Sequence, residues 1–126
     1  MARVMLVEDD PVTCAHLTVR LRSHDHLVLA VESAESALAS IATLGLPDVA
    51  IVDIGLPGRD GLTLLDLLRA QRGPHPLGMI VISAGPCPEP ERLTLSEWTR
   101  FFPKPLPMAE LLAAVEEVRA AAPPAA

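Results

Sequence analysis

Three short apolar segments constrain the fold of this chain more than any other feature. They are RVMLVE (residues 3–8), DVAIVD (48–53) and GMIVISA (78–84), all nearly continuous in apolar side chains and rich in β-branched residues. Such runs are typical of parallel strands buried on both faces, because half-exposed antiparallel strands alternate between apolar and polar residues. LVLAVE (27–32) predicts a fourth strand, and TRFF (99–102) a weaker fifth.

Four other segments carry the apolar periodicity of amphipathic helices. They cover residues 11–23, 33–45, 60–73 and 107–121. Asp10 and Ser33 can cap the first two helices, and Gly45 can end the second. Within the second helix the spacing predicts one apolar stripe, formed by Ala34, Leu38, Ile41 and Leu44.

Residues 85–98 lack a regular pattern. Pro86, Pro88 and Pro90 exclude a regular helix from the first half of this segment, so we expect only a short or irregular helix, from about Glu91 to Trp98. Elsewhere strands and helices alternate along the chain. This alternation predicts the α/β class, with a five-stranded, doubly wound parallel sheet and helices on both faces.

The composition argues against several functions and locations. The net charge of −6 disfavours direct binding of nucleic acid, since contacts with the phosphate backbone need clustered Lys and Arg. No apolar run approaches the roughly 20 residues that cross a bilayer, and no signal peptide is visible, so we expect a cytoplasmic protein without membrane contact. We expect one domain over residues 1–121, followed at 122–126 by a disordered tail or a truncated linker.

Polar side chains stand where the predicted strands end. They are Glu8 and Asp9 after the first strand, Asp53 at the end of the third, Ser83 at the end of the fourth, and Lys104 after the fifth. Ligands of open α/β sheets bind beyond the carboxyl ends of the strands. We therefore expect these side chains to form one site.

The acids of this predicted site suggest a metal. Three carboxylates forced together repel one another, and each raises the pKa of the others unless a cation intervenes. Oxygen ligands without His or Cys suit a hard ion such as Mg²⁺. Together, Mg²⁺ and Lys104 would balance the charges of Glu8, Asp9 and Asp53 before an anionic group arrives. The residues thus predict a magnesium site that accepts an anionic group.

The motifs LVEDD, VDIGLPGRDG, VISA and FPKPL occur in this order and at matching separations. The set resembles the receiver domain of two-component response regulators, in particular single-domain receivers like the chemotaxis regulator. The resemblance covers about residues 2–120. It implies a flavodoxin-like sheet with the strand order 2-1-3-4-5.

The resemblance also implies a reaction. Asp53 would accept a phosphoryl group from a phosphohistidine on a sensor histidine kinase or a histidine phosphotransfer protein, giving an acyl phosphate. Asp53 and Asp9 would contact Mg²⁺ directly, and Glu8 would act through a metal-bound water. The backbone carbonyl of Gly55 would be a further ligand. Lys104 would neutralise charge that develops on the phosphoryl oxygens.

The family's switch implies roles for other residues. The hydroxyl of Ser83 would move toward the phosphoryl group, and Phe101, three residues before the lysine, would rotate inward. A plain core position is the alternative for Phe101. A cis Lys104–Pro105 bond would aim the lysine into the site. Trp98 could anchor a partner, although a core position is favoured.

The main prediction is a bacterial phosphorelay component that signals through protein contacts and catalyses only its own phosphorylation and dephosphorylation. It could instead be a phosphorylation-independent interaction module, or the N-terminal receiver of a longer regulator with an effector domain. A Mg²⁺-dependent phosphohydrolase is disfavoured, because Gly55 stands where such an enzyme needs a second acid. A weak or phosphorylation-dependent homodimer also stays open.

Overall fold

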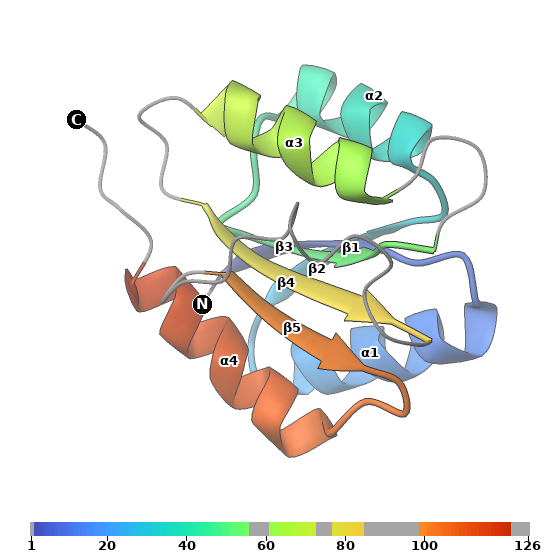
Figure 1. Cartoon of the computed structure of the whole chain (residues 1–126). Coiled ribbons are helices and arrows are strands. Elements are labelled where there is room, and N and C mark those ends of the chain that lie inside the picture. Colours follow the sequence, from blue (N-terminus) through green and yellow to red (C-terminus); the bar gives the residue numbers. More distant parts are fainter. Residues whose placement is uncertain (1, 56–60, 73–76, 85–98, 122–126) are drawn as a thin grey trace.

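The computed structural model describes residues 2–55, 61–72, 77–84 and 99–121 of the chain. One parallel sheet lies at its centre (Figure 1), with the strand order β2-β1-β3-β4-β5. The strands are β1 (Arg3–Val7), β2 (Leu27–Val31), β3 (Val49–Asp53), β4 (Gly78–Ser83) and β5 (Thr99–Pro103). The predicted five-stranded sheet and its strand order are therefore confirmed.

Helices cover both faces of this sheet. They are α1 (Pro11–Ser23), α2 (Ala34–Leu44), α3 (Gly61–Arg72) and α4 (Met108–Ala121). Figure 1 shows α2 and α3 on one face, and α1 and α4 on the other. This is the predicted doubly wound arrangement. Each of these elements begins and ends within about one residue of its predicted bounds, because strong capping and turn residues stand at most of the boundaries.

Alternate residues of the central strands enter two separate cores. From β1, Met5 and Val7 face α2 and α3, whereas Val4 and Leu6 face α1 and α4. β3 and β4 repeat this alternation and are buried along their whole length. β2 differs, because it is an edge strand and three of its five residues are exposed.

The first two helices begin at the predicted caps. Asp10 Oδ2 accepts a hydrogen bond from the backbone N–H of Thr13. Ser33 Oγ accepts one from the backbone N–H of Ser36, at 3.1 Å. Gly45 ends α2 with a φ of +86°, a conformation that side chains other than glycine rarely adopt. The local sequence thus fixes where these helices start and where α2 stops.

The apolar stripe of α2 is not covered along its whole length. Ala34 and Ile41 are buried and Leu38 is partly buried, but Leu44 is 58% exposed. Leu44 lies in the last turn of α2, near Leu29 of the edge strand β2. Among the residues that the structure describes, no further strand lies beyond β2 to cover this side chain. Helical periodicity identifies the face of a residue but not where the sheet beneath that face ends.

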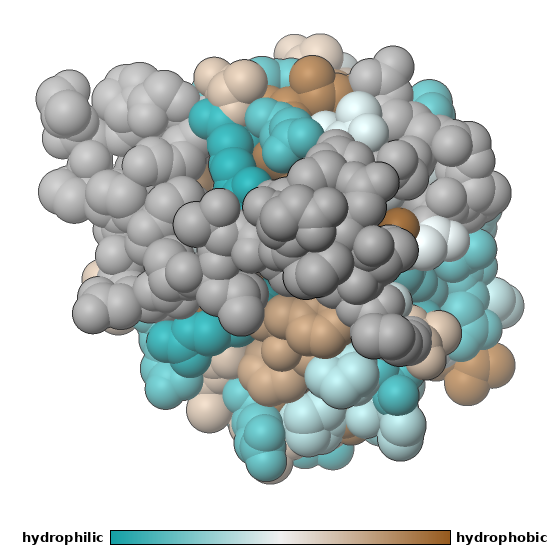
Figure 2. Space-filling model, viewed as in Figure 1, coloured by the Kyte–Doolittle hydropathy of each residue, from teal (hydrophilic) through white to brown (hydrophobic). Residues whose placement is uncertain are grey.

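Two predicted features lie outside the described residues. They are the short or irregular helix from about Glu91 to Trp98 and the tail at 122–126. Within the described ranges, no helix is long and apolar enough to span a membrane. Figure 2 views the molecule from the same side as Figure 1, and its coloured surface there mixes hydrophilic and hydrophobic residues.

Candidate functional site

Four strands bring polar side chains to one edge of the sheet. They are Glu8 after β1, Asp53 at the end of β3, Ser83 at the end of β4 and Lys104 after β5. Backbone hydrogen bonds hold these strand ends together. The N–H of Lys104 donates to the carbonyl of Ser83 at 2.6 Å, and the N–H of Glu8 donates to the carbonyl of Val31 at 3.0 Å. The site therefore rests on the rigid sheet.

The three predicted acids converge. One carboxylate oxygen from each of Glu8, Asp9 and Asp53 lies within 4.8 Å of the others. Glu8 and Asp53 are buried, with only 1% and 5% of their surface exposed, whereas Asp9 is exposed. Lys104 Nζ lies 3.0 Å from Glu8 Oε2 and 3.1 Å from Asp53 Oδ2. The ammonium thus bridges the two buried carboxylates.

The electrostatics of the site reflect this crowding. Burial is the main cause that raises the pKa of Glu8 to about 7, and the neighbouring Asp53 acts in the same direction. The backbone N–H of Asp10, which donates to Glu8 Oε1 at 3.0 Å, and the ammonium of Lys104 oppose this rise in pKa. Burial alone would lower the pKa of Lys104, but hydrogen bonds and charges from both carboxylates raise it above its usual value. Lys104 is therefore a firmly protonated cation.

Asp53 is held at both carboxylate oxygens. Oδ1 accepts a hydrogen bond of 2.8 Å from the backbone N–H of Gly55, and Oδ2 accepts one of 3.1 Å from Lys104 Nζ. Gly61, at the start of α3, packs against the backbone of the same strand end. A Cβ at Gly61 would lie 2.4 Å from Ile54 Cα and 2.5 Å from the carbonyl oxygen of Asp53. Only a glycine lets α3 approach the backbone of Asp53 this closely.

The donor set fits a hard divalent cation. Glu8 Oε2 is buried, and it accepts no well-directed hydrogen bond from the described residues, although the ammonium of Lys104 is close. A buried carboxylate oxygen needs positive charge nearby, and a divalent ion would add to the charge that Lys104 supplies. Because all three acids offer oxygen and no sulfur or nitrogen ligand stands among them, the cluster suits Mg²⁺.

The other predicted residues surround this cluster. Ser83 is buried, and Ala84 beside it is exposed and small. Phe101 is partly buried against the core under α2 and α3, and Phe102 against the opposite core. The Lys104–Pro105 bond is cis, as the resemblance implies. The predicted convergence of site residues is therefore present in the geometry, while the switch role of Phe101 stays a prediction.

Two features of the site could not be predicted from the sequence. The first is the backbone N–H of Asp10, which holds Glu8; a backbone contact does not depend on which side chain is present. The second is a hollow of about 260 Å³ beside Lys104, lined by residues of α1 and of the segment that leads into α4. Val12, on its rim, is 76% exposed. The sequence pattern of a helix does not show whether a single apolar residue such as Val12 is exposed.

Comparison with known proteins identifies the family. The family model described as "Response regulator receiver domain" matches residues 4–116, which is most of the chain. This chain belongs to that family. Receiver domains act in two-component signalling, generally bind Mg²⁺, and interact with histidine kinases or phosphotransfer proteins. The resemblance seen in the sequence motifs is confirmed.

Curated relatives of this receiver domain are bacterial transcriptional regulators. The virulence transcriptional regulatory protein PhoP of Salmonella typhimurium is 46% identical over 65 residues, which are 52% of this chain and 29% of that protein. The transcriptional regulatory protein AruR of Pseudomonas aeruginosa is 41% identical over 85 residues, which are 64% of this chain and 34% of that protein. The matches thus span only about a third of the length of these relatives.

Solved structures of receiver domains agree over nearly the whole chain. The BeF3-activated N-terminal receiver domain of Klebsiella pneumoniae RstA superimposes with a TM-score of 0.76 at 30% identity, covering 93% of this chain and 98% of that one. A putative response regulator from Chloroflexus aurantiacus gives a TM-score of 0.77 at 27% identity, covering 94% and 98%. Both likenesses support the receiver assignment.

Proposed function

We propose that this receiver domain accepts a phosphoryl group on Asp53 from a phosphohistidine of a sensor histidine kinase or a histidine phosphotransfer protein. The position of Lys104 Nζ, 3.0 Å from Glu8 and 3.1 Å from Asp53, is the observation that carries the proposal. A phosphoryl group bonded to Asp53 would lie beside this fixed cation. The cluster of acids to which Asp53 belongs would hold a divalent ion next to the same group.

The proposed reaction transfers the phosphoryl group between two side chains. An oxygen of the Asp53 carboxylate forms a bond to phosphorus while the P–N bond to the donor histidine breaks. The nitrogen keeps the electron pair of that bond, and the imidazole leaves neutral because its other nitrogen carries a proton. The backbone N–H of Gly55 and the ammonium of Lys104 hold the carboxylate in position, so the step depends on orientation and charge.

Mg²⁺ would be held directly by the carboxylates of Asp9 and Asp53 and by the backbone carbonyl of Gly55, and Glu8 would contribute through a metal-bound water. When bound, it would neutralise charge on the phosphoryl oxygens. Lys104 complements it from the other side, since its raised pKa keeps it charged throughout the neutral range. The transferred phosphoryl group would thus contact two cations, the ammonium of Lys104 and the Mg²⁺ ion that the acids hold.

The donor protein needs a contact surface next to Asp53. The pocket beside Lys104, with the exposed Val12 on its rim, offers both apolar and polar side chains next to the site. A partner helix that carries a phosphohistidine and an apolar neighbour could pack there and bring the histidine to Asp53. We propose that this surface receives the phosphodonor.

The signalling output of the domain would follow from a conformational change around the phosphoryl group. Ser83 is buried at the end of β4 and could turn its hydroxyl toward a phosphoryl oxygen, with Phe101 filling the space that this movement opens. We propose that residues 1–121 form this switch in the cytoplasm and that it acts through protein contacts. Any effector activity in a longer protein would be additional to it.

Phosphorylation can be tested with a small-molecule phosphodonor and Mg²⁺, followed by intact-mass measurement. The wild-type chain should gain one phosphoryl group, and Asp53→Asn should gain none. Asp25→Asn is a matched control, because Asp25 is an exposed aspartate outside the site whose φ of +63° an asparagine also adopts. This control should be phosphorylated like the wild type.

Two results would contradict the proposal. Equal labelling of Asp53→Asn and wild type would place the acceptor elsewhere. A wild-type chain that takes no phosphoryl group, although its fold and its Mg²⁺ affinity are intact, would favour a phosphorylation-independent interaction module.

A further inference from the structure

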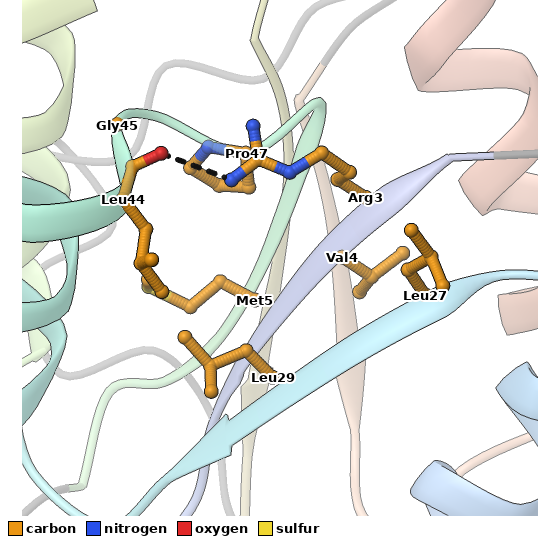
Figure 3. A pocket seen from close by; sticks show the side chains of 8 residues that line it. All are labelled: Arg3, Val4, Met5, Leu27, Leu29, Leu44, Gly45 and Pro47. Carbon is orange, nitrogen blue, oxygen red and sulfur yellow. Dashed lines mark hydrogen bonds between the residues drawn. The ribbon is translucent and has the colours of Figure 1, made fainter.

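The edge strand β2 exposes apolar side chains that the rest of the fold leaves uncovered. Leu27 and Leu29 are 56% and 38% exposed, and Leu44 from α2 lies beside them. Figure 3 shows Leu29, Leu44 and Met5 pointing toward one another around a hollow, which has a volume of about 150 Å³. Nothing in the proposed phosphoryl transfer uses this surface, which lies at the end of β2 away from Glu8.

The backbone of β2 also has hydrogen-bonding groups that its neighbouring strand β1 does not use. The N–H of Leu27 donates to the carbonyl of Ala2, and the carbonyl of Val31 accepts from Glu8, so the odd-numbered residues face β1. In a parallel ladder the residues between them direct their N–H and C=O groups away from the neighbouring strand. Val28 and Ala30 therefore point these groups outward, at the open edge of the sheet.

The residues of this edge strand include none of the side chains that usually prevent strand pairing, although the guanidinium of Arg22 reaches the edge from α1. Edge strands are normally protected by Pro, Lys or inward-pointing charges. The segment Leu27–Val31 (LVLAV) contains none of these, and its residues favour strands. The opposite edge, β5, has Arg100 and Pro103. The difference indicates that β2 is suited to pair with another strand.

We propose that two copies of this chain pair through their β2 strands in antiparallel register, which forms one continuous sheet. The outward groups of Val28 and Ala30 then bond to Ala30 and Val28 of the second copy. This register places Leu29 opposite itself at the two-fold axis and Leu27 opposite Val31 of the second copy. Cross-strand contacts of this kind bury the exposed apolar side chains, and the two-fold symmetry makes the interface self-complementary.

The charges at the two ends of β2 favour the antiparallel direction. Arg22, at the end of α1, reaches the outer side of the strand near its start, where its Nη2 lies 3.5 Å from the carbonyl of Val28. Glu32, just after the strand, is exposed. Antiparallel pairing brings each Arg22 toward Glu32 of the other copy. The bond of 3.5 Å is long, so it yields readily to the shorter N–H···O bond from Ala30 of the second copy.

The strand is short, so the pair should be weak. An interface built on five residues lies at the small end of specific interfaces, where association is transient. Sedimentation velocity of the full chain, from micromolar to near-millimolar concentration, should show a monomer–dimer equilibrium. Arg22→Glu and Glu32→Arg should each weaken association by about tenfold or more, because like charges then meet at both ends of the interface. The double variant should restore it.

A backbone variant supplies a test that does not depend on charge. Ala30→Pro removes an outward N–H but no bond to β1, so it should abolish dimerisation while circular dichroism shows an unchanged fold. Val12→Glu, which alters an exposed valine on another surface, should leave the equilibrium unchanged. A chain that stays monomeric at all concentrations would overturn the proposal. So would a dimer that survives Ala30→Pro, or one that the charge-swapped double variant fails to restore.

Discussion

At the scale of single residues, the tightest packing among the described glycines occurs at Gly61, beside the backbone of Asp53. Because an added Cβ would meet backbone atoms of Ile54 and Asp53, which cannot move aside cheaply, Gly61→Ala should destabilise the fold by about 1–3 kcal/mol. Gly55→Ala is the matched control in the same β3–α3 connection. Its Cβ would meet only Asp53 Oδ1, at 3.4 Å, which is an ordinary contact. Urea unfolding of both variants should show a loss only for Gly61→Ala.

His26 predicts a pH dependence of stability. It is buried, its Nδ1 accepts a hydrogen bond from the backbone N–H of Ala2 at 3.1 Å, and its Nε2 lies 3.1 Å from Glu116. An Nδ1 that accepts this bond requires the neutral ring. Burial is the main cause that lowers the pKa of His26 below 6.5, with the charges of Arg119 and His24 acting in the same direction and Glu116 opposing them.

The sign of the pH effect follows from this lowered pKa. Below pH 6.5 the unfolded chain takes up a proton at position 26 before the folded chain does, so the free energy of unfolding should fall as the pH decreases. The contribution is complete above pH 6.5 and is lost as the pH falls through the folded-state value. Unfolding curves between pH 7.5 and 5 should show a steeper decline for wild type than for His26→Gln. Parallel declines would assign the pH dependence to other groups.

At the scale of elements, α2 depends on its cap. Ser33→Ala removes the hydroxyl that accepts the N–H of Ser36, and it should lower the free energy of unfolding by about 1 kcal/mol. Ser40→Ala, inside the same helix, removes a hydroxyl that caps nothing and introduces a better helix former, so its effect should be small or stabilising. A comparable loss in both variants, measured by thermal unfolding, would show that the cap is not the cause.

Elements were predictable here because local signals agree with the tertiary structure. The β-branched runs of β1, β3 and β4 match strands that are buried on both faces, and Asp10, Ser33 and Gly45 stand at helix ends. Leu44 was not predictable, since its exposure depends on where the sheet stops. The guanidinium of Arg3, which donates to the carbonyls of Leu44 and Leu46, has no local signal either. Contacts between segments that are distant in the sequence do not produce a periodic pattern from which they could be predicted.

At the scale of the whole molecule, the site could be predicted because the carboxyl ends of parallel strands lie at the same edge of the sheet. The sequence places Glu8, Asp53, Ser83 and Lys104 after four strands, and topology alone then brings them together. The bridging position of Lys104 between two buried carboxylates was not predictable from spacing. It depends on side-chain conformation and on the bond from its N–H to Ser83.

The metal should stabilise the whole fold, because it binds an arrangement of acids that exists only in the folded chain. At a Mg²⁺ concentration tenfold above its dissociation constant, the gain is about 1.4 kcal/mol, which corresponds to a few degrees in melting temperature for a chain of this size. Asp9→Asn tests whether the gain comes from the acid cluster. Asp9 is exposed, so its loss should cost little stability without metal, but it removes one of the three converging carboxylates.

The expected result is a melting temperature that rises with Mg²⁺ in the wild type and much less in Asp9→Asn. Glu32→Gln removes an exposed acid outside the cluster, so it should respond to Mg²⁺ like the wild type. A parallel measurement in NaCl at the same ionic strength shows how much of the rise in melting temperature comes from screening of exposed charges and not from specific binding of Mg²⁺. If Mg²⁺ raised the melting temperature of Asp9→Asn as much as that of the wild type, the ion would not be held by these three acids. The proposed role of the cluster in phosphoryl transfer would then lose its basis.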